Sequence, residues 1–190
     1  MAVTGASGAT SLALAVVAEA SASGSWVAMV TVADLGMVAA AEAGLELSRV
    51  ALVPHVAPDQ WPTVVGAMID AMDVLVVGPP PHLRLGDARR LSTRARERGT
   101  VLVTLRGRWA EGADVRLSVG ASRWEGPGRG PGHLDARQVE VVGGGRGAAV
   151  RERRQWVWLP EGNVTAAYSG SDADALSVEA GGGDDQALVG

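Results

Sequence analysis

Apolar residues recur at two different spacings, and the two alternate along the first hundred residues. Apolar side chains three or four positions apart predict helices over residues 8–22, 34–43, 58–72 and 86–98. Short, continuously apolar runs are typical of strands buried on both faces of a parallel sheet, and they occupy residues 26–32, 49–56, 73–77 and 101–105. This alternation predicts an α/β fold with a mostly parallel sheet flanked by helices.

Local signals suggest where one of these helices begins, where another ends and how the second faces the sheet. Asp59 is a suitable N-cap for the helix over 58–72, and Pro62 is tolerated in its first turn. Gly99 should end the helix over 86–98. The inward-facing side chains of that helix are expected to be Leu85, Ala88, Leu91 and Ala95.

Beyond residue 105 the pattern changes to strands without helices. Apolar and polar residues alternate in 115–119, which indicates an antiparallel strand buried on one side. Two more strands are expected over 136–142 and 150–159, so antiparallel strands should extend the sheet. Trp156 and Trp158 alternate on one face of the last strand, where core packing is the first interpretation and partner contact the second.

The two ends of the chain differ in character. Only Met1–Thr4 precede the first helix, so either the first strand is very short or the chain starts inside the domain. Residues 161–190 are rich in Gly, Ser and Asp and show no periodicity, which predicts a flexible acidic tail. We therefore expect one domain over 1–160 followed by this tail.

The composition excludes several kinds of chemistry. All 17 basic residues are arginine, and the chain contains neither lysine nor cysteine. Disulfides, thiolate metal sites, cysteine nucleophiles and lysine Schiff bases are therefore excluded. His55, His82 and His133 lie far apart in the sequence, so no metal site and no cofactor are expected. With no leader sequence and no apolar run near ~18 residues, the sequence predicts a cytoplasmic protein without a membrane span.

Positive charge is concentrated in the middle of the chain. Residues 84–154 carry sixteen arginines against eight acids, whereas the segments before and after them are acidic. Arg90, Arg94 and Arg98 repeat at four-residue intervals on one helix face, and Arg151, Arg153 and Arg154 precede the last strand. These arginines, with Trp156 and Trp158, are the candidate partner-binding residues, although a solvated Arg-rich helix with exposed strand faces is the slightly favoured interpretation of the basic segment.

The turn before the first helix is similar to the phosphate-binding loop of nucleotide-binding ATPases. That motif reads G-x-x-x-x-G-K-[ST], and aligning its second glycine with Gly8 places Ala9 where the lysine belongs. An alanine cannot reach the phosphates or neutralise their charge, so we expect no ATP hydrolysis. The degenerate remnant consists of Gly5, Gly8, Thr10 and Ser11.

The second nucleotide motif is also missing. In such ATPases an apolar strand ends in an aspartate that orders the magnesium ion, but the strand over 73–77 runs into Gly78 and three prolines. No catalytic residue is therefore expected. An unrelated α/β fold that never bound nucleotide is the alternative interpretation.

The order of these features resembles the core of the RecA recombinase family over residues 3–160. The segments that carry the resemblance include GASGATSLAL, WVAMVTV, GLELSRVALVP and ADVRLSV. Within that family, the lost nucleotide motifs, the short length and the RQWVWLP segment resemble the actinobacterial ImuA-prime type. That resemblance implies a RecA-like pseudo-ATPase that acts as an accessory factor in SOS-induced, mutagenic translesion DNA synthesis.

The resemblance also implies partners. These are an inactive Y-family polymerase homologue of the ImuB type, an error-prone C-family polymerase complex and, as a further candidate, RecA itself. A division inhibitor of the SulA type has the same fold and remains an alternative, as does a module that binds single-stranded DNA. A working ATPase with an unconventional loop ranks last.

Overall fold

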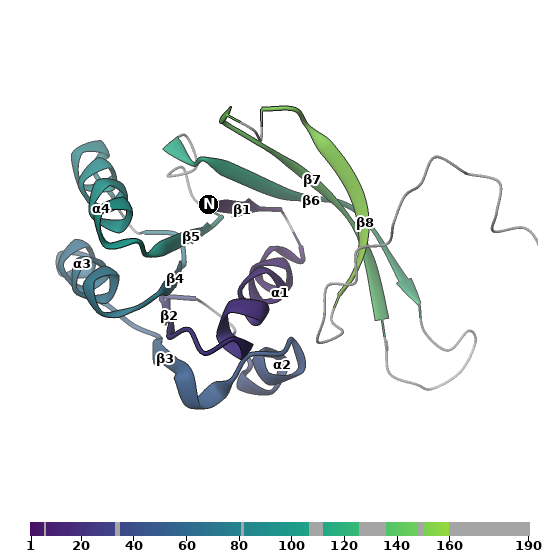
Figure 1. The fold of residues 1–190 in the computed structure, drawn as a ribbon, viewed down its shortest axis with the longest axis horizontal. Helices are drawn as coiled ribbons and strands as arrows, with labels where there is room; N and C mark the ends of the chain where they lie inside the picture. The colour runs from purple at the N-terminus through teal and green to yellow at the C-terminus, as the bar shows by residue number, and fades with distance from the viewer. Residues whose placement is uncertain are drawn as a thin grey trace, which may run out of the picture.

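The fold is a single sheet with helices on both faces of its parallel part, as seen in a computed structural model (Figure 1). The structure describes residues 1–5, 7–32, 35–80, 82–106, 112–125, 136–147 and 150–159. The predicted tail over 161–190 lies outside the described residues, as does His133. The α/β class, with a mostly parallel sheet and antiparallel strands at the end, is confirmed.

The described residues form one sheet of eight strands in the order β3-β2-β4-β5-β1-β6-β7-β8. The strands are β1 (Ala2–Thr4), β2 (Val27–Val30), β3 (Val50–Val53), β4 (Val74–Val77), β5 (Val101–Leu105), β6 (Val115–Glu125), β7 (Ala136–Gly145) and β8 (Arg153–Leu159). Strands β1 to β6 pair in parallel, and β7 and β8 continue the sheet in antiparallel fashion.

Within the described ranges, four α-helices cover the parallel part of the sheet. They are α1 (Ala9–Ala22), α2 (Met37–Glu42), α3 (Trp61–Ala71) and α4 (Leu85–Arg98), and a short 3-10 turn, η1 (Leu47–Arg49), precedes β3. Helices α1 and α2 share one apolar core with the sheet, while α3 and α4 share another on the opposite face (Figure 1). Strands β2 and β4 are buried along their whole length, as their continuous apolar runs require, whereas β3 at the edge of the sheet is only partly buried.

Strand β1 is short but central. Ala2 pairs with Thr104 of β5 on one side and with Arg116 of β6 on the other. Ala2 and Val3 are both buried, so the three-residue strand lies in the interior of the sheet rather than at its edge. The first strand that the structure describes is therefore very short, with three residues.

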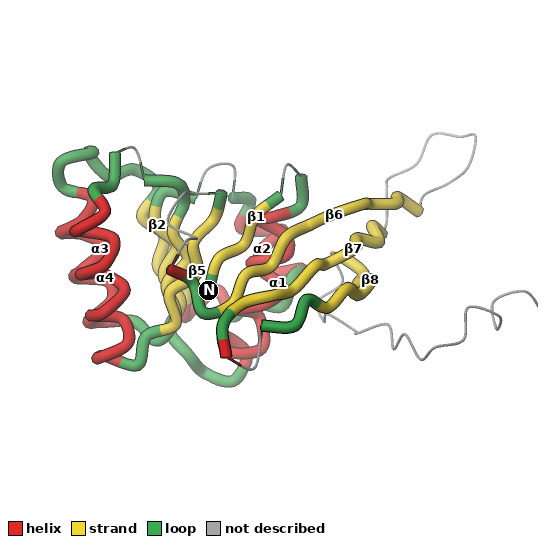
Figure 2. The backbone as a smooth tube through the Cα atoms, turned by 90° about the horizontal axis from the view of Figure 1, so that it is seen from above, coloured by secondary structure: helices red, strands yellow, loops and turns green. Residues whose placement is uncertain are grey.

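Strands β6, β7 and β8 extend beyond the helical layers as a curved, three-stranded sheet (Figure 2). Strand β6 runs farther than the alternating segment 115–119 indicated, and its register with β7 shifts between Val119 and Ser122. This bulge explains why the alternation stops there, because an extra residue reverses the side-chain order.

Two local expectations were wrong. Helix α3 begins at Trp61 with Gln60 as its N-cap, since Pro62 fits the first turn and Asp59 belongs to the preceding turn. The side chain of Leu85 is 63% exposed because it lies in the first turn of α4, ahead of the residues that pack on the sheet. Among the described helices, none has the length and apolar character needed to cross a membrane.

Candidate functional site

The turn between β1 and α1 is where a RecA-like protein would hold phosphate, and here an arginine fills the space beside it. Gly8 is the N-cap of α1 with a left-handed φ of 86°, and Gly5 has a φ of 145°. A Cβ built on Gly8 would lie 3.2 Å from Nη1 of Arg137, a β7 residue whose side chain is only 8% exposed. A cationic side chain therefore packs against the start of α1.

Position 9 is closed to a lysine. Ala9 is fully buried in the core beneath α1, whereas Thr10 and Ser11 are partly exposed. A lysine in place of Ala9 would force its charged chain into or past an apolar core, which is costly when no partner is available. The sequence showed the missing lysine, but only the structure shows that the position cannot easily take one.

The end of β4 is closed as well. Gly78 follows β4, and its backbone N–H donates to the carbonyl oxygen of Val30. A Cβ built on Gly78 would lie 2.0 Å from the carbonyl oxygen of Thr31, so the two backbones approach more closely than any side chain allows. The position where the family's magnesium-ordering carboxylate belongs is thus packed against a neighbouring strand end.

Thr31 itself is held in an unusual conformation. Its φ of 51° is uncommon for a β-branched residue, which makes this backbone strained. The indole Nε1 of the buried Trp61 donates a 3.3 Å hydrogen bond to the Thr31 hydroxyl, and the Thr31 N–H donates to the carbonyl oxygen of Val53. Sequence reasoning missed this cluster because nothing in the pattern marks a threonine with positive φ.

Arg90, Arg94 and Arg98 of α4 do lie on one exposed side of the helix, and a single aspartate of α3 pairs with two of them. Asp70 of α3 accepts hydrogen bonds from Nε of Arg94 at 2.9 Å and from Nε of Arg98 at 3.0 Å. Arg90 has only a 3.8 Å contact with Asp87, and its side chain is 86% exposed. Arg90 therefore extends into solvent next to the cluster formed by Asp70, Arg94 and Arg98.

The Asp70 cluster has a defined pH dependence. The hydrogen bond from Arg94 holds the pKa of the Asp70 carboxyl below its ordinary value, and both arginine charges act in the same direction. The stability contributed by this contact is therefore present at neutral pH and is lost as the pH falls through the lowered pKa. The contribution is small because the groups are solvent-exposed.

The candidate residues before and within β8 divide between the two faces of the sheet. Arg153 lies on the same face of β8 as Val157 and Leu159, which are part of the apolar core under α1. Arg154 lies on the opposite face together with Trp156 and Trp158, whose side chains point away from that core and are partly exposed. The interpretation of the two tryptophans as core residues was therefore wrong, because Val157 and Leu159 take that role.

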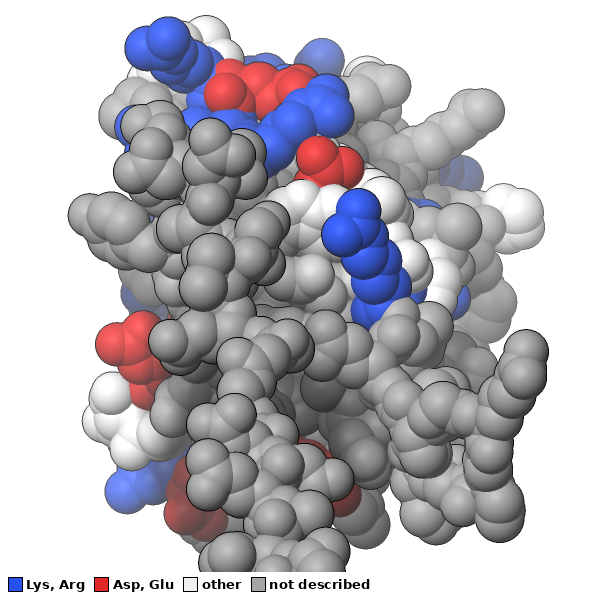
Figure 3. Space-filling model, turned by 90° about the vertical axis from the view of Figure 1, so that its right-hand side faces the viewer, with Lys and Arg blue, Asp and Glu red and all other residues white. Residues whose placement is uncertain are grey.

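Strand β6 brings two arginines to the same side as the tryptophans. The guanidinium carbon of Arg123 lies 4.9 Å from the ring centre of Trp156, and Arg116 is also exposed. Seen from the side of β8, arginine and acidic side chains lie next to one another in the upper part of the molecule (Figure 3). Simple alternation would place Arg116 and Arg123 on opposite faces of β6, so the sequence pattern did not reveal this grouping. The bulge between Val119 and Ser122 brings both arginines to the same face.

The described part of the chain contains no cluster of side chains that could bind a metal ion. Nowhere among those residues do three or more His, Asp or Glu side chains come close enough together to hold a metal ion.

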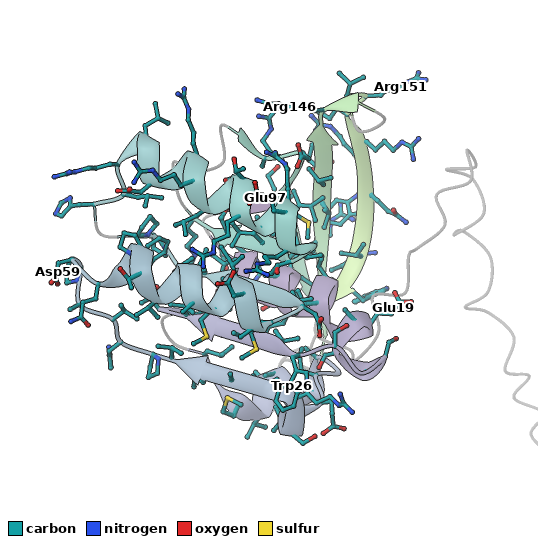
Figure 4. The ribbon with its side chains drawn as sticks, turned by 60° about the vertical axis from the view of Figure 1, so that its left-hand side comes forward. Glu19, Trp26, Asp59, Glu97, Arg146 and Arg151 are labelled. Atoms are coloured by element: carbon teal, nitrogen blue, oxygen red, sulfur yellow. The ribbon has the colours of Figure 1, made fainter. Side chains whose placement is uncertain are left out.

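Arg151 is exposed, as is Arg146, and both lie at the same end of the β6–β8 sheet (Figure 4).

Known proteins are similar to this chain at the level of family and fold. The sequence model of the MT3502 N-terminal domain family matches residues 1–111. The uncharacterized protein Rv3395c of Mycobacterium tuberculosis (strain ATCC 25618 / H37Rv) is 35% identical over 149 residues, which make up 74% of this chain and 72% of that protein. The crystal structure of SulA from Pseudomonas aeruginosa has a TM-score of 0.42 and 16% identity, over 56% of this chain and 97% of that chain.

Proposed function

The chain belongs to the MT3502 N-terminal domain family, and from that premise we propose that it is a non-catalytic accessory protein of a damage-inducible, mutagenic DNA synthesis complex. In this role a RecA-like core that has lost nucleotide hydrolysis serves as a scaffold. The proposal follows the resemblance of the order of elements and of the lost motifs to the ImuA-prime type. Its partners would be an ImuB-type Y-family polymerase homologue, an error-prone C-family polymerase complex and RecA.

One observation carries the non-catalytic part of the proposal. Gly78 approaches the Thr31 carbonyl so closely that a magnesium-ordering carboxylate has no room at the end of β4. Ala9, which replaces the phosphate-loop lysine, is buried in the core. Loss of both elements removes the charge that phosphoryl transfer requires, which supports a role in which the fold binds partners rather than hydrolyses ATP.

Purified protein is expected to show no ATP turnover above background, with or without single-stranded DNA. The Ala9→Lys variant should not gain activity, because no carboxylate is available at Gly78, and it should be less stable than the wild type because Ala9 is buried. A phosphate-release assay measures the turnover, and thermal unfolding measures stability. Specific turnover that a Thr10→Ala change abolishes would contradict the proposal.

Arg90 is the residue on α4 through which we expect an acidic partner surface to bind. Arg90→Glu should weaken co-purification with the ImuB-type partner about tenfold or more and reduce damage-induced mutagenesis, since a charge at an interface is reversed. Arg84→Glu is the matched control, because Arg84 is exposed at the N-cap of α4, outside the face that carries Arg90. Both variants should keep the wild-type Tm.

A strain that lacks the gene separates this proposal from the SulA-type alternative. Deletion of the gene should lower damage-induced mutagenesis and leave filamentation after damage unchanged. Lost filamentation with normal mutagenesis would instead favour a division inhibitor. Full complementation by Arg90→Glu would show that this face of α4 is only solvated surface.

A further inference from the structure

The β6–β8 sheet has a second face that lies opposite the core. We call it the outer face, and its described members are Arg116, Ser118, Arg123, Gln138, Glu140, Val142, Arg154, Trp156 and Trp158. Their common orientation follows from the register, which pairs Ser118 with Val142 and Val142 with Arg154. On the other face Val139 and Val157 are buried against α1.

Among the described elements, no helix lies over the outer face. Helices α3 and α4 lie on this side of the sheet, but they cover β4 and β5 and do not extend over β7 and β8 (Figure 1). Trp156 and Trp158 are consequently partly exposed, although large aromatic side chains on a sheet are usually covered by another layer. Two aromatic rings on an open sheet form a surface on which another molecule can stack.

The charge of the outer face favours an anion. Arg123 and Arg116 make no ion pair with any described acidic side chain, and Arg154 is shared by Glu140 at 3.7 Å and Glu152 at 3.0 Å. Glu140 is the one acidic side chain described on the face itself, where it lies over the bulge beside Gly120. Arg146 and Arg151 add further positive charge at one end of the sheet (Figure 4).

We propose that the outer face of β6–β8 binds single-stranded nucleic acid, with bases stacked on Trp156 and Trp158 and phosphates held by Arg116, Arg123 and Arg154. Residues two apart on a strand are separated by about 6.8 Å. This is about twice the 3.4 Å between stacked bases of one duplex strand. The two rings therefore suit an extended single strand whose bases are separated from one another, and they cannot reach the paired, stacked bases of a duplex.

Arg123 strengthens this arrangement. Its guanidinium already lies over the ring of Trp156, so the pair is ordered before a ligand arrives. An arginine plane can itself stack on a base while its charge attracts phosphate. A protein partner fits less well, since Val142 is the one aliphatic side chain among the described members of the face and an interface core requires more apolar area.

The charge test uses a fluorescein-labelled oligo(dT) and fluorescence anisotropy across a salt series. Changing both Arg116 and Arg123 to glutamate should raise Kd at least tenfold and should make the slope of log K against log salt shallower by about 1.4, which is about 0.7 for each lost phosphate contact. The control with the same change in charge carries Arg84→Glu and Arg89→Glu on α4, away from the outer face. The control should bind with a slope equal to that of the wild type.

The stacking test separates aromatic contact from charge. Trp156→Ala with Trp158→Ala should raise Kd at least tenfold, whereas the conservative pair Trp156→Phe with Trp158→Phe should retain most of the affinity because each ring keeps a π-face. Wild-type tryptophan fluorescence should be quenched by oligo(dT), and this quenching should be largely lost in the alanine pair. The Tm of each variant shows that the sheet still forms.

Three results would overturn the inference. The wild type could fail to bind oligo(dT) at low salt, the outer-face variants could bind as tightly as the α4 control, or duplex DNA could bind as tightly as oligo(dT). If the outer-face variants instead lose a protein partner without any effect on DNA, the face is a protein-docking surface. These outcomes are independent of the scaffold proposal, which is tested by ATP turnover and by Arg90.

Discussion

The Gly78→Asp variant is expected to be less stable than the wild type by about 3 kcal/mol or more, and to remain without ATPase activity. The first atom of any side chain at this position would lie 2.0 Å from the Thr31 carbonyl oxygen, which belongs to the backbone and cannot rotate away. The new carboxylate would also be buried, since Gly78 is buried at the end of β4. For a chain of this size the Tm should fall by about 6–12 °C.

A matched glycine substitution separates crowding from a general effect of removing glycine. A Cβ on Gly86, within α4, would meet no atom within 4 Å, so Gly86→Ala should be neutral or stabilising by up to about 1 kcal/mol. Gly78→Ala should already be destabilising. An unchanged Tm in Gly78→Asp would mean that the strand end can open, and it would weaken the argument against a magnesium site there.

Trp61→Ala should lower the free energy of unfolding by about 3–5 kcal/mol, as expected for the loss of a large buried ring. Trp61 is 1% exposed and lies in the core between α3, α4 and the sheet. Urea unfolding followed by far-UV circular dichroism gives the measurement without depending on tryptophan fluorescence. Trp26→Ala is the control, since Trp26 is 47% exposed and its loss should cost less than about 1 kcal/mol.

The hydrogen bond between Trp61 and Thr31 can be measured separately. Trp61→Phe and Thr31→Val each remove the bond while keeping most of the side-chain volume, so each should cost about 1 kcal/mol. Their double variant should be less destabilised than the sum of the two. Additive effects would show that the bond does not hold the strained backbone at Thr31, and a loss below about 1 kcal/mol in Trp61→Ala would contradict the tight packing.

Most elements of the fold followed from apolar periodicity. The predicted helix over 8–22 is observed as Ala9–Ala22 and the strand over 101–105 as Val101–Leu105, because both packing patterns extend through the whole element. Ends were less predictable where a local rule competed with geometry, as at Asp59, where Pro62 determines the start of α3. The length of β6 was missed because a bulge breaks its alternation.

The candidate site was predictable in what it lacks but not in why it lacks it. The alanine at position 9 and the glycine at position 78 are visible in the sequence, but the close contact of Gly78 with Thr31 joins two strands that only the sheet brings together. Likewise the four-residue spacing placed Arg94 and Arg98 on one helix face, but it gave no sign of Asp70, which is on another helix and pairs with both. Contacts between elements need a register, which periodicity does not supply.

The central place of β1 affects the order in which the chain can fold. Its residues are synthesised before those of β5 and β6, yet Ala2 pairs with Thr104 and Arg116, so these pairings form only after both later strands have left the ribosome. Until β1 inserts between them, β5 and β6 each present an unpaired edge, which is a surface for association with other chains. Such distant pairings slow folding because the chain entropy is lost before the contact is gained. The three residues of β1 therefore complete a sheet whose seven other described strands are made after them.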